Sequence, residues 1–366
     1  MRLIPEAMRP EVAKAKEILK KANMVTLVYH DDADGVCSAA LAMLGLNKLR
    51  VNIRRKICLE KLFPQAIKAI HSEQAENDVV LYVDLGSPHV DKVIREIKNE
   101  KVIIIDHHDP KRITSENVIH INPELYGLTG ERDAEYVNKV RVLRSRKTVR
   151  YYVDFHGLRK PHTALSSMLS TMASIGYYNG GPEKAVRSCI EGFSEDILKF
   201  HDRMKALKSE LFKKAYDKVY AHGLSMGKYV QWFDIGDLFY NIGVKSIGLF
   251  TSQLKYRRIV DQEKYLLGFM KMNPNIPGLG KLEGDFVKVS GRTPPALDEK
   301  VRKGTMPGLG KIMTEAAEEV GGFADGHDFA ASGIIGANRI LAFIEKFEEK
   351  VEEKIERKGL FKYFIK

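Results

Sequence analysis

The sequence predicts an α/β protein whose first domain is a doubly wound parallel sheet. Runs rich in Val, Ile and Leu recur in the first third of the chain, and stretches with amphipathic helical spacing separate them. The runs are continuously apolar and do not alternate with polar residues, which is typical of strands buried on both faces of a sheet. Parallel strands need helical crossovers, and the intervening stretches are long enough to supply them.

The individual elements follow from the same patterns. A helical stretch at about 9–22 comes first, and the first strand, MVTLVYH, follows it. The strands are expected at 24–30, 50–57, 78–84, 101–106 and 117–121. The crossover helices are expected at 36–49, 60–73 and 88–99.

Changes in composition predict the domain boundaries. The first domain is expected to span 1–193. A basic insertion with scattered aromatic residues, at about 123–161, interrupts its alternation of strands and helices. A long charged helix and linker at 194–227 would connect it to a smaller, glycine-rich α/β domain at 228–337. A charged amphipathic helix and tail at 338–366 complete the prediction.

Composition limits the function classes. The chain has 366 residues, a hydrophobic content of 44% and a net charge of +11, which favours polyanionic partners and nucleic acid first. No apolar run reaches the length of a membrane span and no apolar signal segment begins the chain, so a cytoplasmic protein without a membrane partner is expected. Cys37, Cys58 and Cys189 lie far apart without a CxxC pair, and we expect reduced, mostly structural thiols.

The first strand ends in HDDADG, which is the first of three polar clusters. If the backbone stays extended, His30, Asp32 and Asp34 project to one side. Gly35 would then permit a sharp turn into a helix beginning near Val36. Taken alone, this cluster could equally be a capped strand–helix turn.

Two further clusters favour a metal site. The third strand ends at Asp84 and the fourth ends in Asp106, His107 and His108. The carboxyl ends of parallel strands meet at one edge of the sheet, where open α/β sheets bind ligands. Mixed carboxylate and imidazole donors suit two divalent ions, manganese or magnesium rather than structural zinc, with Asp84 as the bridging carboxylate and a water activated between the ions.

These motifs resemble those of the DHH phosphoesterases, specifically RecJ-like nucleases of archaeal type, including the Hef-associated type. The strings that carry the resemblance are HDDADG, VDLG and DHH. Downstream, VSGRTP at 289–294 and VGGFADGHDFAASG at 320–333 resemble the DHH-associated C-terminal domain. The resemblance covers roughly 24–122 and 228–337, and it implies a DHH domain joined by a long helix to a smaller substrate-binding domain.

The resemblance also implies roles for individual residues. Asp84 and His108 would be catalytic, with His108 touching the scissile phosphate or a metal-bound water. The expected metal ligands are His30, Asp32, Asp34, Asp84, Asp106 and His107. In the second domain, the groups expected to hold the phosphates or terminal nucleotide of the substrate are Arg292, His327 and the backbone of Gly321, Gly322 and Gly326. For Arg292 alone, a solvated surface charge is the alternative.

One departure from the family pattern stands out. Members of this family usually supply a fourth aspartate after the helix that follows the third motif. The corresponding stretch here, STMASIGYYNGGPEKA at 170–185, contains no Asp. Asp154 in the insertion is an alternative candidate, and the three intact motifs still favour an active enzyme.

The insertion also suggests how a substrate could bind. Within 139–160, Arg and Lys residues interleave with Tyr151, Tyr152 and Phe155. Such a surface can neutralise phosphates and stack bases of a single strand, and a solvated basic hairpin is the alternative.

The favoured function is a metal-dependent phosphodiesterase that hydrolyses single-stranded DNA or RNA, as an exonuclease in nucleic-acid repair or turnover. The first alternative is a phosphodiesterase of short oligonucleotides or cyclic dinucleotides. The second is a non-catalytic, RecJ-like replication or repair scaffold, which the absent fourth aspartate favours.

The C-terminal sequence RKGLFKYFIK suggests a further partner. Leu360, Tyr363 and Phe364 have the spacing of a sliding-clamp-binding box, although Arg357 stands where the box has glutamine. A sliding clamp is therefore a candidate partner, and a repair helicase is another candidate. The alternative is that these apolar side chains pack back onto the body of the protein.

Overall fold

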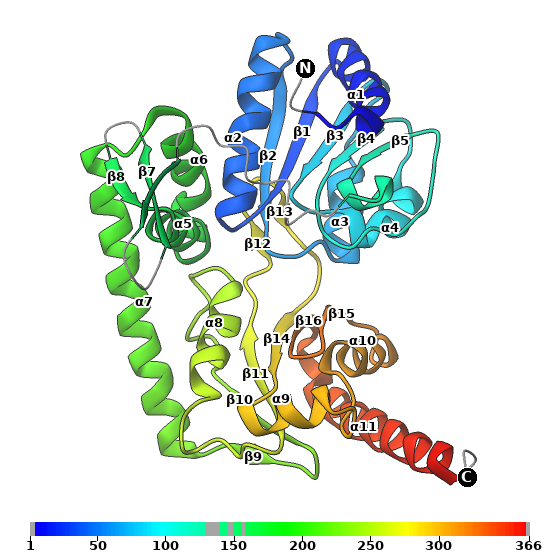
Figure 1. Cartoon of the computed structure of the whole chain (residues 1–366), viewed down its shortest axis with the longest axis vertical. Helices are drawn as coiled ribbons and strands as arrows, with labels where there is room; N and C mark the ends of the chain where they lie inside the picture. The colour runs from blue at the N-terminus through cyan, green and yellow to red at the C-terminus, as the bar shows by residue number, and fades with distance from the viewer. Residues whose placement is uncertain (1–3, 129–139, 145–148, 156–157, 364–366) are drawn as a thin grey trace. The chain divides into compact units, whose positions relative to one another are not determined.

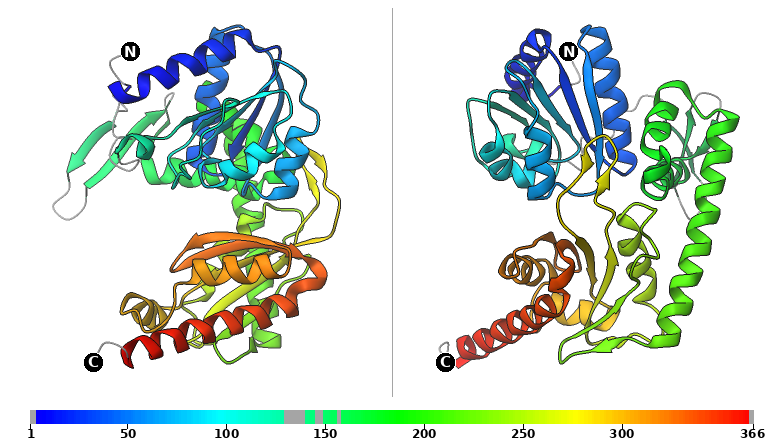
Figure 2. Two further views of the ribbon diagram at one scale, coloured as in Figure 1. Left: turned by 90° about the vertical axis from the view of Figure 1, so that its right-hand side faces the viewer. Right: turned by 180° about the vertical axis from the view of Figure 1, so that it is seen from behind.

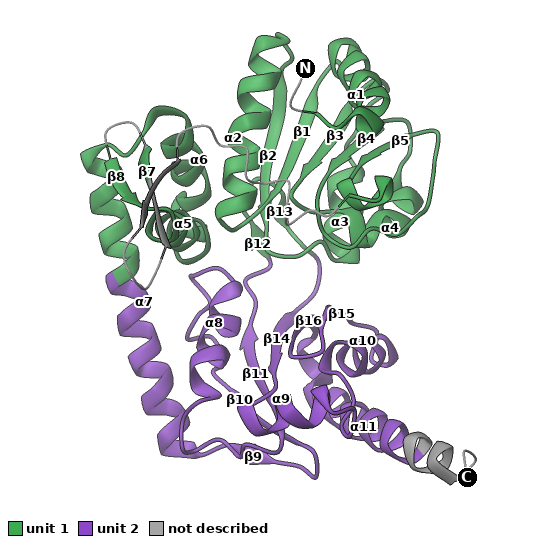
Figure 3. Ribbon diagram, in the orientation of Figure 1, with its two compact units in different colours: residues 1–205, 275–282 green, residues 206–274, 283–366 purple. Residues whose placement is uncertain are grey.

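The computed structural model divides the chain into two compact units. Unit 1 comprises residues 1–205 and 275–282, and unit 2 comprises residues 206–274 and 283–366 (Figure 3). The structure describes residues 4–128, 140–144, 149–155 and 158–363, with the backbone alone for 140–152 where described, 155 and 357–363. Within these ranges, no helix is both long and apolar enough to cross a membrane.

Unit 1 is built on a five-stranded, fully parallel sheet, which confirms the predicted fold class (Figure 1). The strand order is β2-β1-β3-β4-β5, so the chain reverses its direction of travel across the sheet beside β1. The strands are β1 (Val25–His30), β2 (Ile53–Leu59), β3 (Val79–Val83), β4 (Lys101–Ile105) and β5 (Val118–Ile121). Ligands of such sheets bind at this kind of switch point, outside the carboxyl ends of the strands.

Helices cover both faces of this sheet, as the continuous apolar strands require. The helices are α1 (Arg9–Lys21), α2 (Ala33–Lys48), α3 (Pro64–His71) and α4 (Val90–Glu96). α2 lies on one face, and α3 and α4 pack against each other on the other (Figure 1; Figure 2). Every residue of β3 is buried, which matches its VVLYV sequence.

The register of the strands lines up their carboxyl ends. Tyr29 pairs with Val83, Val83 with Ile105, and Ile105 with Ile121. The residues that follow these four positions along the chain are His30, Asp84, Asp106 and Asn122. Because the four positions are level across the sheet, these polar residues form one row at its carboxyl edge.

The turn after β1 differs from the prediction. α2 begins at Ala33 and not near Val36, because the Asp32 carboxylate caps the helix by accepting a hydrogen bond from the Gly35 N–H (3.1 Å). Gly35 therefore lies inside the first helical turn. Its role is close approach, since a Cβ there would lie 2.3 Å from the His30 carbonyl oxygen.

The remainder of unit 1 contains a small antiparallel sheet and more helices. Its elements are β6 (Val140–Arg144), β7 (Val149–Phe155), β8 (Leu158–Pro161), α5 (His162–Ser170), a π-helical turn (Thr171–Ile175) and α6 (Gly181–Glu191). α5 and α6 both pack against α2. The long helix α7 (Glu195–His222) then continues from unit 1 into unit 2.

Unit 2 is a six-stranded mixed sheet in the order β15-β16-β14-β11-β10-β9. Only β10 and β11 pair in parallel, and the other pairs are antiparallel. The strands are β9 (Ser225–Met226), β10 (Val230–Asp234), β11 (Tyr265–Lys271), β14 (Phe286–Arg292), β15 (Phe323–His327) and β16 (Ala330–Gly336). Between β11 and β14, the hairpin of β12 (Asn275–Ile276) and β13 (Gly280–Lys281) belongs to unit 1.

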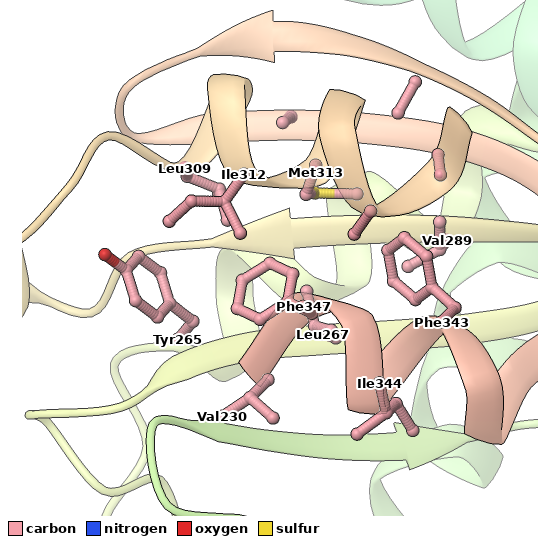
Figure 4. Close-up of a cluster of buried hydrophobic side chains, with 14 of the residues drawn as sticks. Val230, Tyr265, Leu267, Val289, Leu309, Ile312, Met313, Phe343, Ile344 and Phe347 are labelled. Atoms are coloured by element: carbon pink, nitrogen blue, oxygen red, sulfur yellow. The ribbon is translucent and has the colours of Figure 1, made fainter. Parts of the chain in front are cut away.

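The core of unit 2 lies between this sheet and two of its helices. The helices of the unit are α8 (Lys245–Leu254), α9 (Pro295–Arg302), α10 (Leu309–Glu319) and α11 (Ile340–Tyr363). Phe343 and Phe347 of α11 pack with Ile312 and Met313 of α10 over the apolar face of β11 and β14 (Figure 4). α11 is therefore an integral part of the folded unit.

Candidate metal centre

The predicted ligands gather in two groups at the carboxyl edge of the parallel sheet. One group contains His30, Asp32 and Asp84, and the other contains Asp84, Asp106, His107 and His108. Within each group, the candidate ligand atoms all lie within 4.8 Å of one another. Asp84 belongs to both groups, which is the position that a bridging carboxylate would need.

Asp84 is held in an unusual conformation. Its φ of +59° is rare for a residue with a side chain, and such strain is typical of functional sites. The residue is 3% exposed, and its Oδ2 makes no hydrogen bond to any described part of the protein. Burial raises the pKa of this carboxyl, His30 lowers it, and the charge of Asp32 raises it further. A buried carboxylate with an unused oxygen is costly unless a cation joins it.

The ring of His30 is oriented for coordination. Its Nε2 lies 3.1 Å from the carbonyl oxygen of Glu60. Because a carbonyl only accepts hydrogen bonds, Nε2 donates to it, and Nδ1 is the nitrogen that offers a lone pair to a cation when the ring is neutral. Nδ1 lies 2.9 Å from Asp32 Oδ2 and 3.5 Å from Asp84 Oδ2, so it faces the first group.

Asp106 orients the neighbouring histidines. Its Oδ1 accepts hydrogen bonds from His108 Nδ1 (2.6 Å) and from the N–H groups of His107 and His108, and its Oδ2 accepts from the Ser87 N–H. Burial raises the pKa of Asp106, but these hydrogen bonds outweigh it and lower the pKa to about 2. Each oxygen thus accepts a hydrogen bond, so Asp106 positions the histidines, and its role as a ligand stays a prediction.

His108 gains a fixed orientation from this contact. Its hydrogen bond to Asp106 raises its pKa, although partial burial opposes the effect. Since Nδ1 is bonded to the carboxylate, Nε2 is the nitrogen left to meet a substrate. His107 stacks on His108 and brings its Nδ1 to 3.4 Å from Asp84 Oδ1.

A buried hydrogen-bond network behind the histidines could not be recognised in the sequence. Asn122 Nδ2 donates to the His108 carbonyl (2.8 Å) and to Ser87 Oγ (2.9 Å). Ser87 Oγ shares a further hydrogen bond with His120 Nε2 (2.7 Å). Ser87 and Asn122 are fully buried. Ser87 follows β3 and Asn122 follows β5, so the network holds the loop after β4 in place from both neighbouring strands. Its only sequence signal is that Asn122 follows an apolar strand, which is common.

Two predicted acids are not brought into either group. Asp34 lies exposed in the first turn of α2, and neither group of described residues includes it. Asp154 is exposed on β7 and is likewise outside both groups. In the stretch that lacks the fourth aspartate, Ser170 Oγ accepts a hydrogen bond from the Ala33 N–H (3.2 Å), so a neutral side chain contacts the first motif.

Two of the predicted substrate residues of unit 2 lie on strands that flank β16. Arg292 on β14 and His327 on β15 both pair with Ala330 of β16, so the three residues are level. The guanidinium of Arg292 donates to neutral acceptors, Ser252 Oγ (2.8 Å), the Gly291 carbonyl (2.7 Å) and Ser290 Oγ (3.0 Å). These contacts fix the direction of the guanidinium.

The predicted glycines lie at both ends of β15, and only Gly326 is next to His327. Gly326 has a φ of +146° and a Cβ there would lie 2.4 Å from Ala331 Cα, so only glycine fits. Gly321 and Gly322 follow α10, where Gly321 has a φ of +73°. His327 itself is exposed at the end of β15.

Two predictions fall on residues whose side chains lie outside the description. In the insertion, these include Arg144, Arg146, Lys147, Arg150, Tyr151, Tyr152 and Phe155. At the C-terminus, Leu360 and Tyr363 lie within α11 but only their backbone is described, and Phe364 lies beyond the described residues. The single-strand surface and the clamp-binding box therefore stay predictions.

The donor set fits divalent cations. The unused Oδ2 of buried Asp84, the Nδ1 lone pair of His30 and the carboxylate of Asp32 converge, and no thiolate is among the grouped residues. Oxygen and imidazole donors without sulfur suit manganese or magnesium. His107 would complete the second group from the other side of Asp84.

Comparison with known families settles the class of this domain. Residues 24–153 match the DHH family, N-terminal domain, and the matched segment contains all three motifs. The chain therefore contains a DHH-family N-terminal domain. No curated protein matches its sequence.

Solved structures with the same fold include RecJ of Thermus thermophilus in complex with Mn²⁺, which has a TM-score of 0.52 and 15% identity. The match covers 96% of this chain and 55% of that one, so this chain spans about half the length of that RecJ. CDC45 from Entamoeba histolytica matches with a TM-score of 0.54 at 8% identity, over 94% of this chain and 98% of that one. At these identities the likeness concerns the fold. Together with the DHH domain, the convergent ligand groups support a metal-dependent phosphoesterase.

Proposed function

We propose that this protein is a divalent-metal-dependent phosphodiesterase that hydrolyses single-stranded DNA or RNA from an end. The observation that carries the proposal is Asp84, a buried, strained carboxylate shared by two ligand groups and with one oxygen unused by the protein. Bound divalent ions would supply an activated water and neutralise charge on the phosphate. The candidate holders of these ions are His30, Asp32, Asp84 and His107.

The other residues of the edge would act on the substrate. In hydrolysis, a water oxygen bonds to phosphorus and the bond to the departing sugar oxygen breaks. His108, held through Nδ1 by Asp106, would donate a hydrogen bond or a proton from Nε2 to a phosphate oxygen or to the departing oxygen. Its raised pKa keeps the ring protonated closer to neutral pH, which suits that role.

The choice of a nucleic-acid substrate rests on charge and on unit 2. A net charge of +11 attracts polyanions, and Arg292 presents a guanidinium fixed by neutral acceptors. A planar donor fork of this kind suits the phosphate or terminal nucleotide of a strand end. His327 and the Gly326 backbone would bind beside it.

A test needs metal-stripped protein and end-labelled strands longer than the roughly 16 nucleotides that one binding surface covers. We expect hydrolysis of single-stranded DNA or RNA only after manganese or magnesium is restored, with products shortening from one end. Blocking either end in turn reveals the polarity. A rate higher on a dinucleotide than on the long strand would replace the proposal with the short-oligonucleotide alternative.

A second candidate is a non-catalytic scaffold that binds single strands. It is favoured by one observation, namely that Ser170, and not an acid, contacts the first motif in the stretch expected to hold the fourth aspartate. Tight strand binding without hydrolysis in any divalent metal would support it and reject the enzyme.

A further inference from the structure

Two cysteines that are distant in sequence meet in unit 1. Cys37 on α2 and Cys189 on α6 are 152 residues apart, yet their sulfur atoms lie 3.7 Å from each other. The two helices pack together, and both thiols are free. The sequence gives no sign of this contact, because no local pattern relates two cysteines 152 residues apart.

The separation is that of two reduced thiols in contact. A disulfide has a sulfur–sulfur distance near 2.05 Å, so the atoms at 3.7 Å must approach by about 1.7 Å. Side-chain rotation about the Cα–Cβ bonds supplies movement of this size, and both residues sit on helices that already contact each other.

An oxidant can reach this pair. Cys37 and Cys189 are both partly exposed, whereas the third cysteine, Cys58, is buried in β2 at 3% exposure. The contact with Cys189 lowers the pKa of Cys37, although burial opposes the effect. The same contact and burial raise the pKa of Cys189. In a contacting pair of this kind, one thiol reacts with the oxidant first and the other resolves the product.

We propose that Cys37 and Cys189 form a reversible disulfide that joins α2 to α6. With hydrogen peroxide as oxidant, the Cys37 thiol takes up one oxygen to become a sulfenic acid and releases one water. The Cys189 thiol then attacks the Cys37 sulfur, the S–O bond breaks, and a second water leaves. Two thiols are oxidised and one peroxide is reduced, and a dithiol reverses the reaction.

The bond would secure the helix that carries the first motif. Asp32 caps α2, and Cys37 lies little more than one turn further along the same helix. A covalent link over 152 residues of chain restricts the unfolded state strongly. The site would therefore become more resistant to unfolding without any change in its ligands. This inference goes beyond the proposed function and does not depend on it.

The experiment uses the full chain in a chelator, so that bound metal does not catalyse other oxidation. After treatment with hydrogen peroxide, we expect the thiol count to fall from three to one while the protein stays monomeric on a non-reducing gel. Peptide mapping should recover a Cys37–Cys189 cross-link. The melting temperature should rise by about 5 °C or more, and dithiothreitol should reverse the rise.

Cysteine variants provide matched controls. Cys58→Ser should still form the bridge, with the thiol count falling from two to none, whereas Cys37→Ser and Cys189→Ser should show no stabilisation. Three surviving thiols, a bridge that includes Cys58, or oxidation of Cys37 without a cross-link would each overturn the proposal.

Discussion

Two buried acids of unit 1, Asp84 and Glu100, have opposite surroundings. Glu100 precedes β4 at the amino end of the sheet and is fully buried, and its oxygens accept hydrogen bonds from His71 Nδ1 and from the N–H groups of Lys98 and Asn99. Asp84 follows β3 at the carboxyl end, where Oδ2 accepts no hydrogen bond from described residues. The pKa of Glu100 is lowered despite its burial, whereas burial raises the pKa of Asp84.

The comparison distinguishes an acid that is buried as part of the fold from an acid that is buried for function. At Glu100 the fold itself satisfies the charge, and the network continues from His71 to the hydroxyl of Tyr82 (2.8 Å). At Asp84 the fold bears the cost of an incompletely satisfied carboxylate and of a strained φ. An uncompensated buried carboxylate of this kind is expected at a site that binds a cation.

The sharpest test of this difference is Asp84→Asn. Asparagine tolerates the positive φ of this position, so the backbone should be preserved. We expect metal-dependent hydrolysis to fall by about 10³-fold or more, since a metal ion contributes several kcal/mol to the transition state. The unfolding free energy of the metal-free protein should stay the same or rise. Substantial destabilisation without loss of manganese binding in calorimetry would reverse our interpretation of Asp84.

Asp106→Asn sharpens the comparison at the same edge, because Asp106 is fully hydrogen-bonded like Glu100 but contacts His108. We expect kcat to fall by about 10- to 100-fold, as is typical when an orienting partner is changed. Manganese affinity should change little, and the pH dependence of kcat should shift because the pKa of His108 falls. If manganese affinity is lost together with kcat, Asp106 is a ligand, as the sequence first suggested.

Glu100→Gln is the matched variant at the other end of the sheet. Removing one partner of a buried, charged hydrogen bond to His71 should lower the unfolding free energy by about 2–3 kcal/mol. Manganese affinity and kcat at a temperature well below melting should stay within about twofold of the parent values. Denaturant titration and calorimetry measure both quantities on the same samples.

Lowering the pH should reduce the loss of unfolding free energy caused by Glu100→Gln. The folded-state pKa of Glu100 lies below the ordinary value of 4.5, so its stabilising contribution is present above that pH and is lost as the pH falls through the folded-state value. The stability difference between the parent and Glu100→Gln should therefore be largest near neutral pH and shrink below pH 4.5. A difference that grows in acid would show that the carboxyl is neutral in the folded protein.

The sequence predicted the parallel sheet well because burial on both faces leaves a simple apolar pattern. Where this apolar pattern is weaker, the predicted bounds of the elements are less accurate. β2 spans Ile53–Leu59 and not 50–57, because it is an edge strand whose first residues alternate between exposed and partly buried. The start of α2 was misplaced because a cap and one close contact at Gly35 decide it, and neither is visible without the fold.

The polar row at the carboxyl edge was predictable for a different reason. Parallel register brings the ends of β1, β3 and β4 together, so acids and histidines after these strands must be neighbours. The Asn122–Ser87–His120 network and the Cys37–Cys189 contact depend on side-chain packing between distant segments, which no local pattern encodes. Strand alternation does not apply to Asp34, because α2 already begins at Ala33, and its role as a ligand stays a prediction.

The hairpin of residues 275–282 has a consequence for how the protein is made. It lies against edge strand β2, where a Cβ on Gly278 would approach the Lys56 carbonyl oxygen to 2.2 Å (Figure 3). During synthesis, the ribosome completes residues 1–205 long before it reaches this hairpin. Until then the outer edge of β2 lacks that cover, and exposed strand edges pair readily with other chains. A fragment that ends at residue 205 should therefore self-associate, although it holds every residue of both ligand groups.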